Sequence, residues 1–194
     1  LHETAAWIAE GHIGQLTGVA IPGGLPVEVS GAGCVQLTQM RGVTDREVAW
    51  VEGWTSPPVD GYSAPEADEL TLDCPAYGRL GLSGGVVCVV PEPRAEARVA
   101  CRVAVTGTGG QVFLQWPENV CLVGTGALTT PMRPAFLDPE RPGRSMAPML
   151  QRLLDAVDSG APEVPCSGHD YRQALEIAIA LKLSAADGHR RVTL

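Results

Sequence analysis

The side chains with the greatest chemical capacity in this sequence form one short cluster, His169-Asp170-Tyr171, which opens an apolar stretch. Histidine can take up a proton near neutral pH, so His169 and Asp170 are candidates for a substrate contact or a general base. Tyr171 can hydrogen-bond an anionic or hydroxylated ligand. The alternative is structural: Asp170 caps the start of a helix and His169 is a surface residue. The preference of aspartate for helix N-caps favours this alternative.

A further candidate is Gln36, which lies on a predicted early helix together with Gln39. These amides can hydrogen-bond a ligand hydroxyl without taking part in chemistry, or they form an ordinary polar helix face. We assign no catalytic, cofactor-binding or metal-binding residue in this chain. The predicted substrate-binding set has four members: His169, Asp170, Tyr171 and Gln36.

Two glycine-rich segments resemble phosphate-binding loops but lack the residues that such loops need. Gly31-Ala32-Gly33 has Gln36 where a dinucleotide loop has its third glycine, and no acidic residue closes a second strand about 20 residues later. The segment Gly107 to Gly110 joins two predicted strands, which indicates a hairpin. The six cysteines show neither a C-x-x-C pair nor zinc-site spacing. We therefore expect no cofactor and no metal for this chain alone.

The composition bounds the class of protein. A chain of 194 residues that is 45% hydrophobic suits one domain. Its net charge is −8, and its one lysine and thirteen arginines form no basic run except Arg190-Arg191, so a nucleic-acid partner is not expected. No apolar run approaches the ~20 residues that span a bilayer, and no signal-peptide pattern is present. Because most cysteines sit in apolar runs, we read them as reduced and expect a cytoplasmic protein without a membrane partner.

Apolar periodicity predicts the elements that must position these residues. The last helix is apolar nearly all round, so we expect it to be buried on more than one side. We expect a long loop over 124–143 and four helices, at residues 1–10, 32–41, 145–159 and 170–188. The predicted strands are 15–22, 47–54, 70–74, 79–90, 98–106, 111–116, 120–123 and 190–194.

This order of elements predicts a segregated α+β fold, with a sheet of about six or more strands and helices on one face. Several strands carry apolar residues at both odd and even positions, and therefore on both faces, as in the sequence VVCVV of residues 86–90. A sheet face that is apolar but not covered by helices favours a partner. We therefore predict a homodimer or higher homo-oligomer through the open sheet face.

Several motifs together resemble the C-terminal domain of the Gfo/Idh/MocA oxidoreductases, a family named for glucose-fructose oxidoreductase and inositol dehydrogenase. WIAEGHIG at 7–14 looks like the start of that domain, and VAVTGTGGQVFL at 103–114 looks like its glycine hairpin. Residues 150–160, Ala174-Leu175 and SAADG at 184–188 look like its last two helices. The resemblance covers nearly the whole chain. It implies an open, mainly antiparallel sheet of the dihydrodipicolinate-reductase-like kind, whose other face commonly makes a dimer.

The resemblance also implies an N-terminal Rossmann domain that binds NAD or NADP, and hydride transfer to or from a sugar- or polyol-like substrate. That domain is absent from residues 1–194, so this chain alone should be a single substrate and dimerisation domain without activity. The family carries an Asp and a His spaced D-x-x-x-H on its early helix. In this sequence Gly31 and Val35 occupy the matching positions, and neither side chain can move a proton.

Two hypotheses therefore stay open. The chain is the substrate and dimerisation domain of an NAD(P)-dependent oxidoreductase, or it belongs to a non-catalytic ligand-binding or assembly protein that kept the fold. Overall resemblance favours the first hypothesis, and the Gly31/Val35 pair favours the second. The sequence does not distinguish NAD from NADP or identify the substrate.

Overall fold

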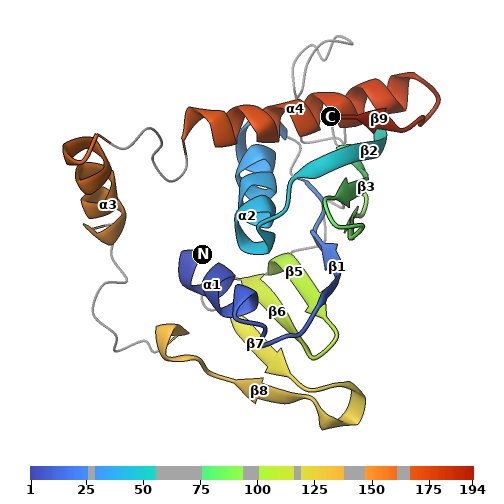
Figure 1. Ribbon diagram of the computed structural model, residues 1–194. Helices are drawn as coiled ribbons and strands as arrows, with labels where there is room; N and C mark the ends of the chain where they lie inside the picture. The colour runs from blue at the N-terminus through green and yellow to red at the C-terminus, as the bar shows by residue number, and fades with distance from the viewer. Residues whose placement is uncertain (26–28, 56–75, 94–100, 116–118, 138–146, 161–166) are drawn as a thin grey trace.

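The computed structural model describes residues 1–25, 29–55, 76–93, 101–115, 119–137, 147–160 and 167–194 (Figure 1). Its helices are α1 (His2–Ala9), α2 (Cys34–Thr44), α3 (Ala147–Asp158) and α4 (Gly168–Ala186), with a π-helical turn (Val29–Gly33) running into α2. Short 3-10 helices lie at Gly126–Leu128 and Ala135–Leu137. The strands are β1 (Leu16–Ala20), β2 (Val48–Thr55), β3 (Ala76–Leu82), β4 (Val87–Val90), β5 (Cys101–Gly107), β6 (Gly110–Gln115), β7 (Val120–Val123), β8 (Thr130–Met132) and β9 (Val192–Thr193).

The nine described strands form one sheet in the order β8-β7-β6-β5-β1-β4-β3-β2-β9. Every pairing is antiparallel except that of β1 with β4. The predicted fold class, an α+β domain with an open and mainly antiparallel sheet, is confirmed. Among the helices that the structure describes, none combines the length and the apolar composition needed to cross a bilayer.

One face of the sheet is the core of the molecule. A single row of paired residues crosses seven strands on this face, and each member is no more than 5% exposed: Val51, Leu80, Cys88, Val19, Val105, Val112 and Cys121. Side chains alternate between the two faces of a strand, so on each of these strands every second residue from this row also points toward the core. Helices α2 and α4 pack on the sheet. The backbone of α4 lies so close to β2 that a Cβ at Gly53 would collide with the carbonyl group of Leu181.

The neighbouring row points to the opposite face, which the described helices leave open. None of its members is buried: Glu52, Arg79, Val89, Ala20, Ala104, Phe113 and Val120. Five of these seven residues are apolar, so the open face is an apolar surface with an ion pair at one end. The alternation that predicted two apolar faces is therefore present in the structure.

Helix α4 differs from its prediction. It buries Ala174, Ile177, Ala178, Ala180, Leu181 and Ser184, whereas Ile179 and Leu183 are 40% and 56% exposed. The helix therefore packs with one broad side rather than all round, since α2 and the sheet lie on the same side of it (Figure 1). Its C-terminus ends as expected: Gly188 has a φ of +64°, and the His189 N–H donates to the Ser184 carbonyl at 2.8 Å, which closes a Schellman motif.

Helices α1 and α3 form where the sequence predicts them. The buried residues of α1 are Thr4 and Trp7. Helix α3 ends at Asp158, and Gly160, whose φ is +64°, lies just beyond its end. Figure 1 shows α3 standing clear of the other helices. Its apolar face is accordingly exposed, at Leu150, Leu153, Leu154 and Val157.

The predictions for one strand and for one loop are wrong. The expected single strand over 79–90 is a hairpin of β3 and β4, because Gly84 and Gly85 both take positive φ and reverse the chain. The expected loop over 124–143 contains β8 and two 3-10 helices within its described part. Short strands with few apolar residues, such as TPM in β8, give no periodic signal. The expected strand at 70–74 lies outside the described residues.

Candidate functional site

The start of α4 is a capping box, and it fixes the position of Asp170. Ser167 is the N-cap, and its hydroxyl accepts a hydrogen bond from the Asp170 N–H at 3.3 Å. The Asp170 carboxylate in turn accepts from the Ser167 N–H at 2.9 Å. Asp170 therefore caps the helix from its third position, which corrects the prediction that Asp170 is itself the N-cap. A carboxylate held in this way has a structural role.

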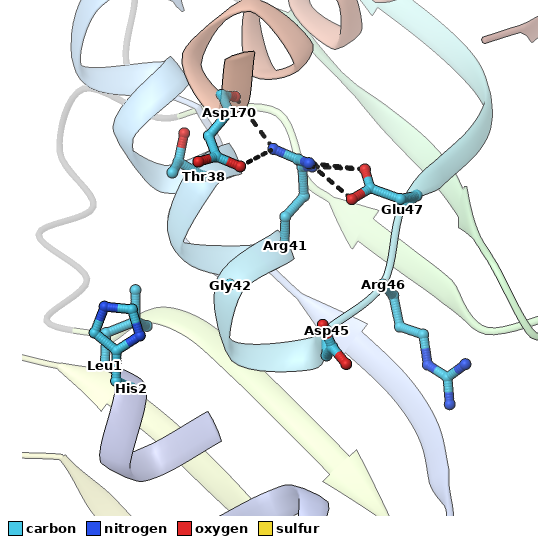
Figure 2. Close-up of a pocket in the computed structure, with 9 residues that line it drawn as sticks. All are labelled: Leu1, His2, Thr38, Arg41, Gly42, Asp45, Arg46, Glu47 and Asp170. Atoms are coloured by element: carbon cyan, nitrogen blue, oxygen red, sulfur yellow. Dashed lines mark hydrogen bonds and ion pairs between the residues drawn. The ribbon is translucent and has the colours of Figure 1, made fainter. Parts of the chain in front are cut away.

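The guanidinium of Arg41 joins this helix start to the rest of the fold (Figure 2). Arg41 is 7% exposed and lies on α2. It donates to both carboxylate oxygens of Glu47 at 2.8 Å and to the Asp170 carbonyl at 3.1 Å, and it also donates to the Gln173 amide oxygen. One buried cation thus ties α2, the segment before β2 and the first turn of α4 together. Bidentate carboxylate pairing of this kind gives a defined geometry.

A cavity of about 230 Å³ lies beside this cluster and is lined by Leu1, His2, Thr38, Arg41, Gly42, Asp45, Arg46, Glu47 and Asp170 (Figure 2). Its central cation is already engaged by three protein partners, so Arg41 has little capacity left for a ligand. Partial burial does most to lower the pKa of His2 from its ordinary value, and the positive charges of Arg152 and the N-terminus add to the effect. We therefore conclude that the residues lining this cavity serve mainly to hold the fold together.

The structure does not gather the four predicted residues into one site. Asp170 lines the cavity of Figure 2, whereas His169, Tyr171 and Gln36 do not. His169 is exposed, and Tyr171, 47% exposed, hydrogen-bonds the thiol of Cys34. Burial raises the pKa of this thiol, and the hydrogen bond from Tyr171 opposes the rise. The side chain of Gln36 leaves its buried amide oxygen without a hydrogen-bond partner in the described part of the chain.

A second cavity, of about 310 Å³, has the chemistry of a ligand site. It lies between α2 and the β5–β6–β7 part of the sheet and is lined by Leu1, Gln39, Arg102, Leu114, Gln115 and Asn119. The amide oxygen of Gln39 is buried and has no hydrogen-bond partner among the described residues. An unsatisfied buried acceptor costs about 1–3 kcal/mol. Exchanging the oxygen and nitrogen of the amide would leave a buried N–H group in the same place, so the need for a partner persists.

Neighbouring residues hold one wall of this cavity in place. The Asn119 amide oxygen accepts from the Gln115 N–H at 3.3 Å, and the Asn119 amide nitrogen donates to the Thr4 hydroxyl at 3.2 Å. Thr4 is itself buried, at 1% exposure. Asn119 is therefore oriented by its own contacts, while Arg102 is exposed beside it.

Sequence reasoning recognised only part of this cavity. It named Gln39 as equivalent to Gln36 but predicted Gln36 as the ligand contact, and it missed Arg102, Gln115 and Asn119. Arg102 carries a signal in the sequence, because it is a charged residue inside an otherwise apolar strand. The register of β5 against β6 shifts between Cys101 and Val103, so a β-bulge redirects Arg102, and alternation alone does not predict this direction.

The positions of the expected acid/base pair hold no ionisable side chain. Gly31 lies in the π-helical turn before α2, and Val35 is in the first turn of α2 with 47% exposure. No group of three or more His, Cys, Asp or Glu side chains in the described ranges is placed to hold a metal ion. The two glycine clusters do not fit a dinucleotide either, since Gly31 to Gly33 is helical and Gly107 to Gly110 closes the β5–β6 hairpin.

No protein-family model matches this sequence, and no curated protein matches it. Solved structures match it throughout. The aldose-aldose oxidoreductase from Caulobacter crescentus, complexed with glycerol, is 20% identical with a TM-score of 0.68, over 99% of this chain and 59% of that one. An oxidoreductase from Agrobacterium radiobacter, in complex with NAD+, L-tartaric acid and magnesium, is 17% identical with a TM-score of 0.63, over 98% and 60%. The oxidoreductase domain protein from Kribbella flavida is 16% identical with a TM-score of 0.72, over 98% and 61%.

All three of these structural neighbours are described as oxidoreductases, and at 16–20% identity the likeness to them is one of fold. The chain therefore has the fold that its sequence resemblance implied, that of an oxidoreductase C-terminal domain. It spans about three fifths of the length of the solved chains that it matches.

Proposed function

We propose that this chain is the substrate-binding and dimerisation domain of an NAD(P)-dependent oxidoreductase that acts on a hydroxyl group of a sugar- or polyol-like substrate. The cavity at Gln39 carries this proposal. It is lined by the amide side chains of Gln39, Gln115 and Asn119, in a fold shared with oxidoreductases, two of which were solved with polyhydroxylated small molecules. An amide side chain can form hydrogen bonds with a substrate hydroxyl.

The dinucleotide would be bound outside the described part of this chain, since its glycine clusters form a helix and a hairpin. NAD(P), when bound, supplies hydride transfer. The chain would contribute substrate binding and orientation. Since Gly31 and Val35 carry no proton-transferring group, a proton acceptor for alcohol oxidation would have to come from a residue elsewhere.

The open sheet face supports the dimerisation part of the proposal. Its central row carries Val89, Ala20, Ala104, Phe113 and Val120, none of which is buried. Contiguous apolar surface of this kind marks interaction sites on soluble proteins. A second copy of the chain, placed face to face in an isologous pair, would cover it.

The Gly31/Val35 pair favours a second candidate, a non-catalytic protein that binds a ligand or assembles through the same fold. Half-exposed Val35 faces solvent in the position where the family carries its histidine. The two candidates share the ligand cavity and the open face. They differ in cofactor binding and turnover.

Titration of the intact protein with NADH and with NADPH, followed by nicotinamide fluorescence, separates the candidates. Saturable binding of either nucleotide is expected for the oxidoreductase. Absence of binding by both nucleotides would overturn the oxidoreductase proposal and leave the non-catalytic one. Residues 1–194 expressed alone are expected to show no dehydrogenase activity.

A further inference from the structure

Arg102 is the charged side chain of the cavity at Gln39, and nothing in the described part of the chain neutralises it. The other described lining side chains are neutral, and no acidic side chain in the described ranges lies within ion-pair distance of Arg102. Arg41, Arg79, Arg172 and Arg191 each pair with a glutamate, whereas Arg46 and Arg152, like Arg102, form no ion pair with a described residue.

The fold presents Arg102 to the cavity through a specific backbone feature. The β-bulge between Cys101 and Val103 redirects the intervening residue, while Val103 continues the buried row with 0% exposure. Bulges of this kind are found next to functional sites, where they aim a side chain. At this register shift an exposed cation lines a cavity that is also lined by Gln39.

The cavity thus combines three kinds of contact. Arg102 offers charged donors, Gln39 offers a neutral amide side chain, and Leu1 and Leu114 offer apolar surface. A guanidinium matches the two oxygens of a carboxylate, and a hydroxyl donates to an amide oxygen. The volume of about 310 Å³ lies at the small end of ligand pockets, which limits the ligand to a small molecule.

We propose that this cavity binds a small hydroxylated carboxylate, with Arg102 on the carboxylate and Gln39 on a hydroxyl. The inference rests on the proposed function and narrows its substrate class from neutral sugars and polyols to hydroxy acids. A neutral polyol would leave Arg102 without a partner. A phosphate group carries nearly two negative charges, and the described part of the cavity lining supplies one charged side chain.

Isothermal titration of the intact protein with sodium D-gluconate, D-glucitol and glucose 6-phosphate tests the proposal, in one buffer of matched ionic strength. The three probes have chains of equal carbon number and differ in the charged group. Gluconate is expected to bind at least about tenfold more tightly than glucitol, as a charged hydrogen-bonded contact provides. Equal binding of gluconate and glucitol, tighter binding of glucose 6-phosphate, or no binding of gluconate would each overturn it.

Variants locate the binding to this cavity. Arg102→Gln is expected to weaken gluconate binding at least about tenfold and to leave glucitol binding unchanged. Arg102→Lys should recover part of the loss. Gln39→Leu should weaken both ligands and fold at least as stably as the wild type, since it removes an unsatisfied buried oxygen. The matched control is Arg172→Gln, on an exposed arginine of α4, and it should bind gluconate as the wild type does.

An NADH titration of the same samples keeps the two proposals apart. Nucleotide binding together with equal affinity for gluconate and glucitol would retain the oxidoreductase and refute the hydroxy-acid site. Gluconate binding that depends on Arg102, without binding of either nucleotide, would retain the site in a non-catalytic protein.

Discussion

At the scale of single residues, the hydroxyl of Ser184 holds the end of α4 to the sheet. It accepts a hydrogen bond from the Gly53 N–H at 2.9 Å and donates to the Arg190 carbonyl at 2.6 Å, and Ser184 is 0% exposed. Ser184→Ala would leave both backbone groups without a partner, so we expect a loss of about 1–3 kcal/mol in the free energy of unfolding. Urea denaturation measures it. Ser159→Ala, at an exposed serine just after α3, should change this free energy by less than about 0.5 kcal/mol.

The ion pairs of Glu52, also at the scale of single residues, predict that the stability of the fold depends on pH. Hydrogen bonds from Arg191, at 2.9 and 3.1 Å, do most to hold the pKa of Glu52 below its ordinary value; the positive charge of Arg79 helps, and desolvation opposes them. A lowered folded-state pKa contributes stability above the unfolded value of about 4.3 that is lost as pH falls through the folded value. The melting temperature of Glu52→Gln should therefore lie furthest below that of the wild type near pH 7.

The gap between these two melting temperatures should narrow below about pH 4, where the unfolded-state glutamate becomes protonated. Melting curves at pH 7, 5 and 3.5 measure the gap. Glu176→Gln provides the control, because Glu176 forms an exposed pair with Arg172 within α4. A gap for Glu52→Gln that stays constant over this range would contradict the assigned role of Arg191 and Arg79.

At the scale of elements, the capping box decides where α4 begins. Ser167 supplies the cap, and Asp170 and Arg41 connect the first turn of the helix to α2. Removal of a serine cap costs about 1 kcal/mol, so Ser167→Ala is expected to lower the free energy of unfolding by that amount. Ser167→Thr should restore most of it. Thermal and urea unfolding measure both, and an unchanged stability of Ser167→Ala would show that the box does not contribute.

At the scale of the whole molecule, the open sheet face predicts a dimer. Light scattering of the intact protein should give at least twice the mass of one chain at micromolar concentration. Phe113→Glu introduces a charge into the apolar row of this face and should shift the protein toward the monomer without unfolding it, since Phe113 is not buried. Leu128→Glu, at an 81% exposed leucine outside the strands, should leave the mass unchanged. A wild-type monomer at this concentration would refute the dimer.

The sequence by itself determined most of the elements and the class of fold. Apolar periodicity located all four helices and most strands, because each pattern reports which side of one element faces the core. The glycines of the β5–β6 hairpin were also readable, since a tight turn between two apolar strands is a local property. The end of β3 and the start of β4 could not be predicted from the sequence, because the apolar residues continue on both sides of the Gly84-Gly85 turn without a change of pattern.

Only the tertiary structure decided which polar residues share a cavity. His169, Asp170, Tyr171 and Gln36 are readable as polar residues beside apolar helices, yet the capping box occupies Asp170 and only Asp170 lines the cavity at Arg41. Gln39 and Arg102 are 63 positions apart, and a register shift in β5 brings them to one cavity. Such a shift depends on strand pairing across the sheet, which is a non-local interaction. The composition of the cavity therefore follows from the packed sheet rather than from any single stretch of sequence.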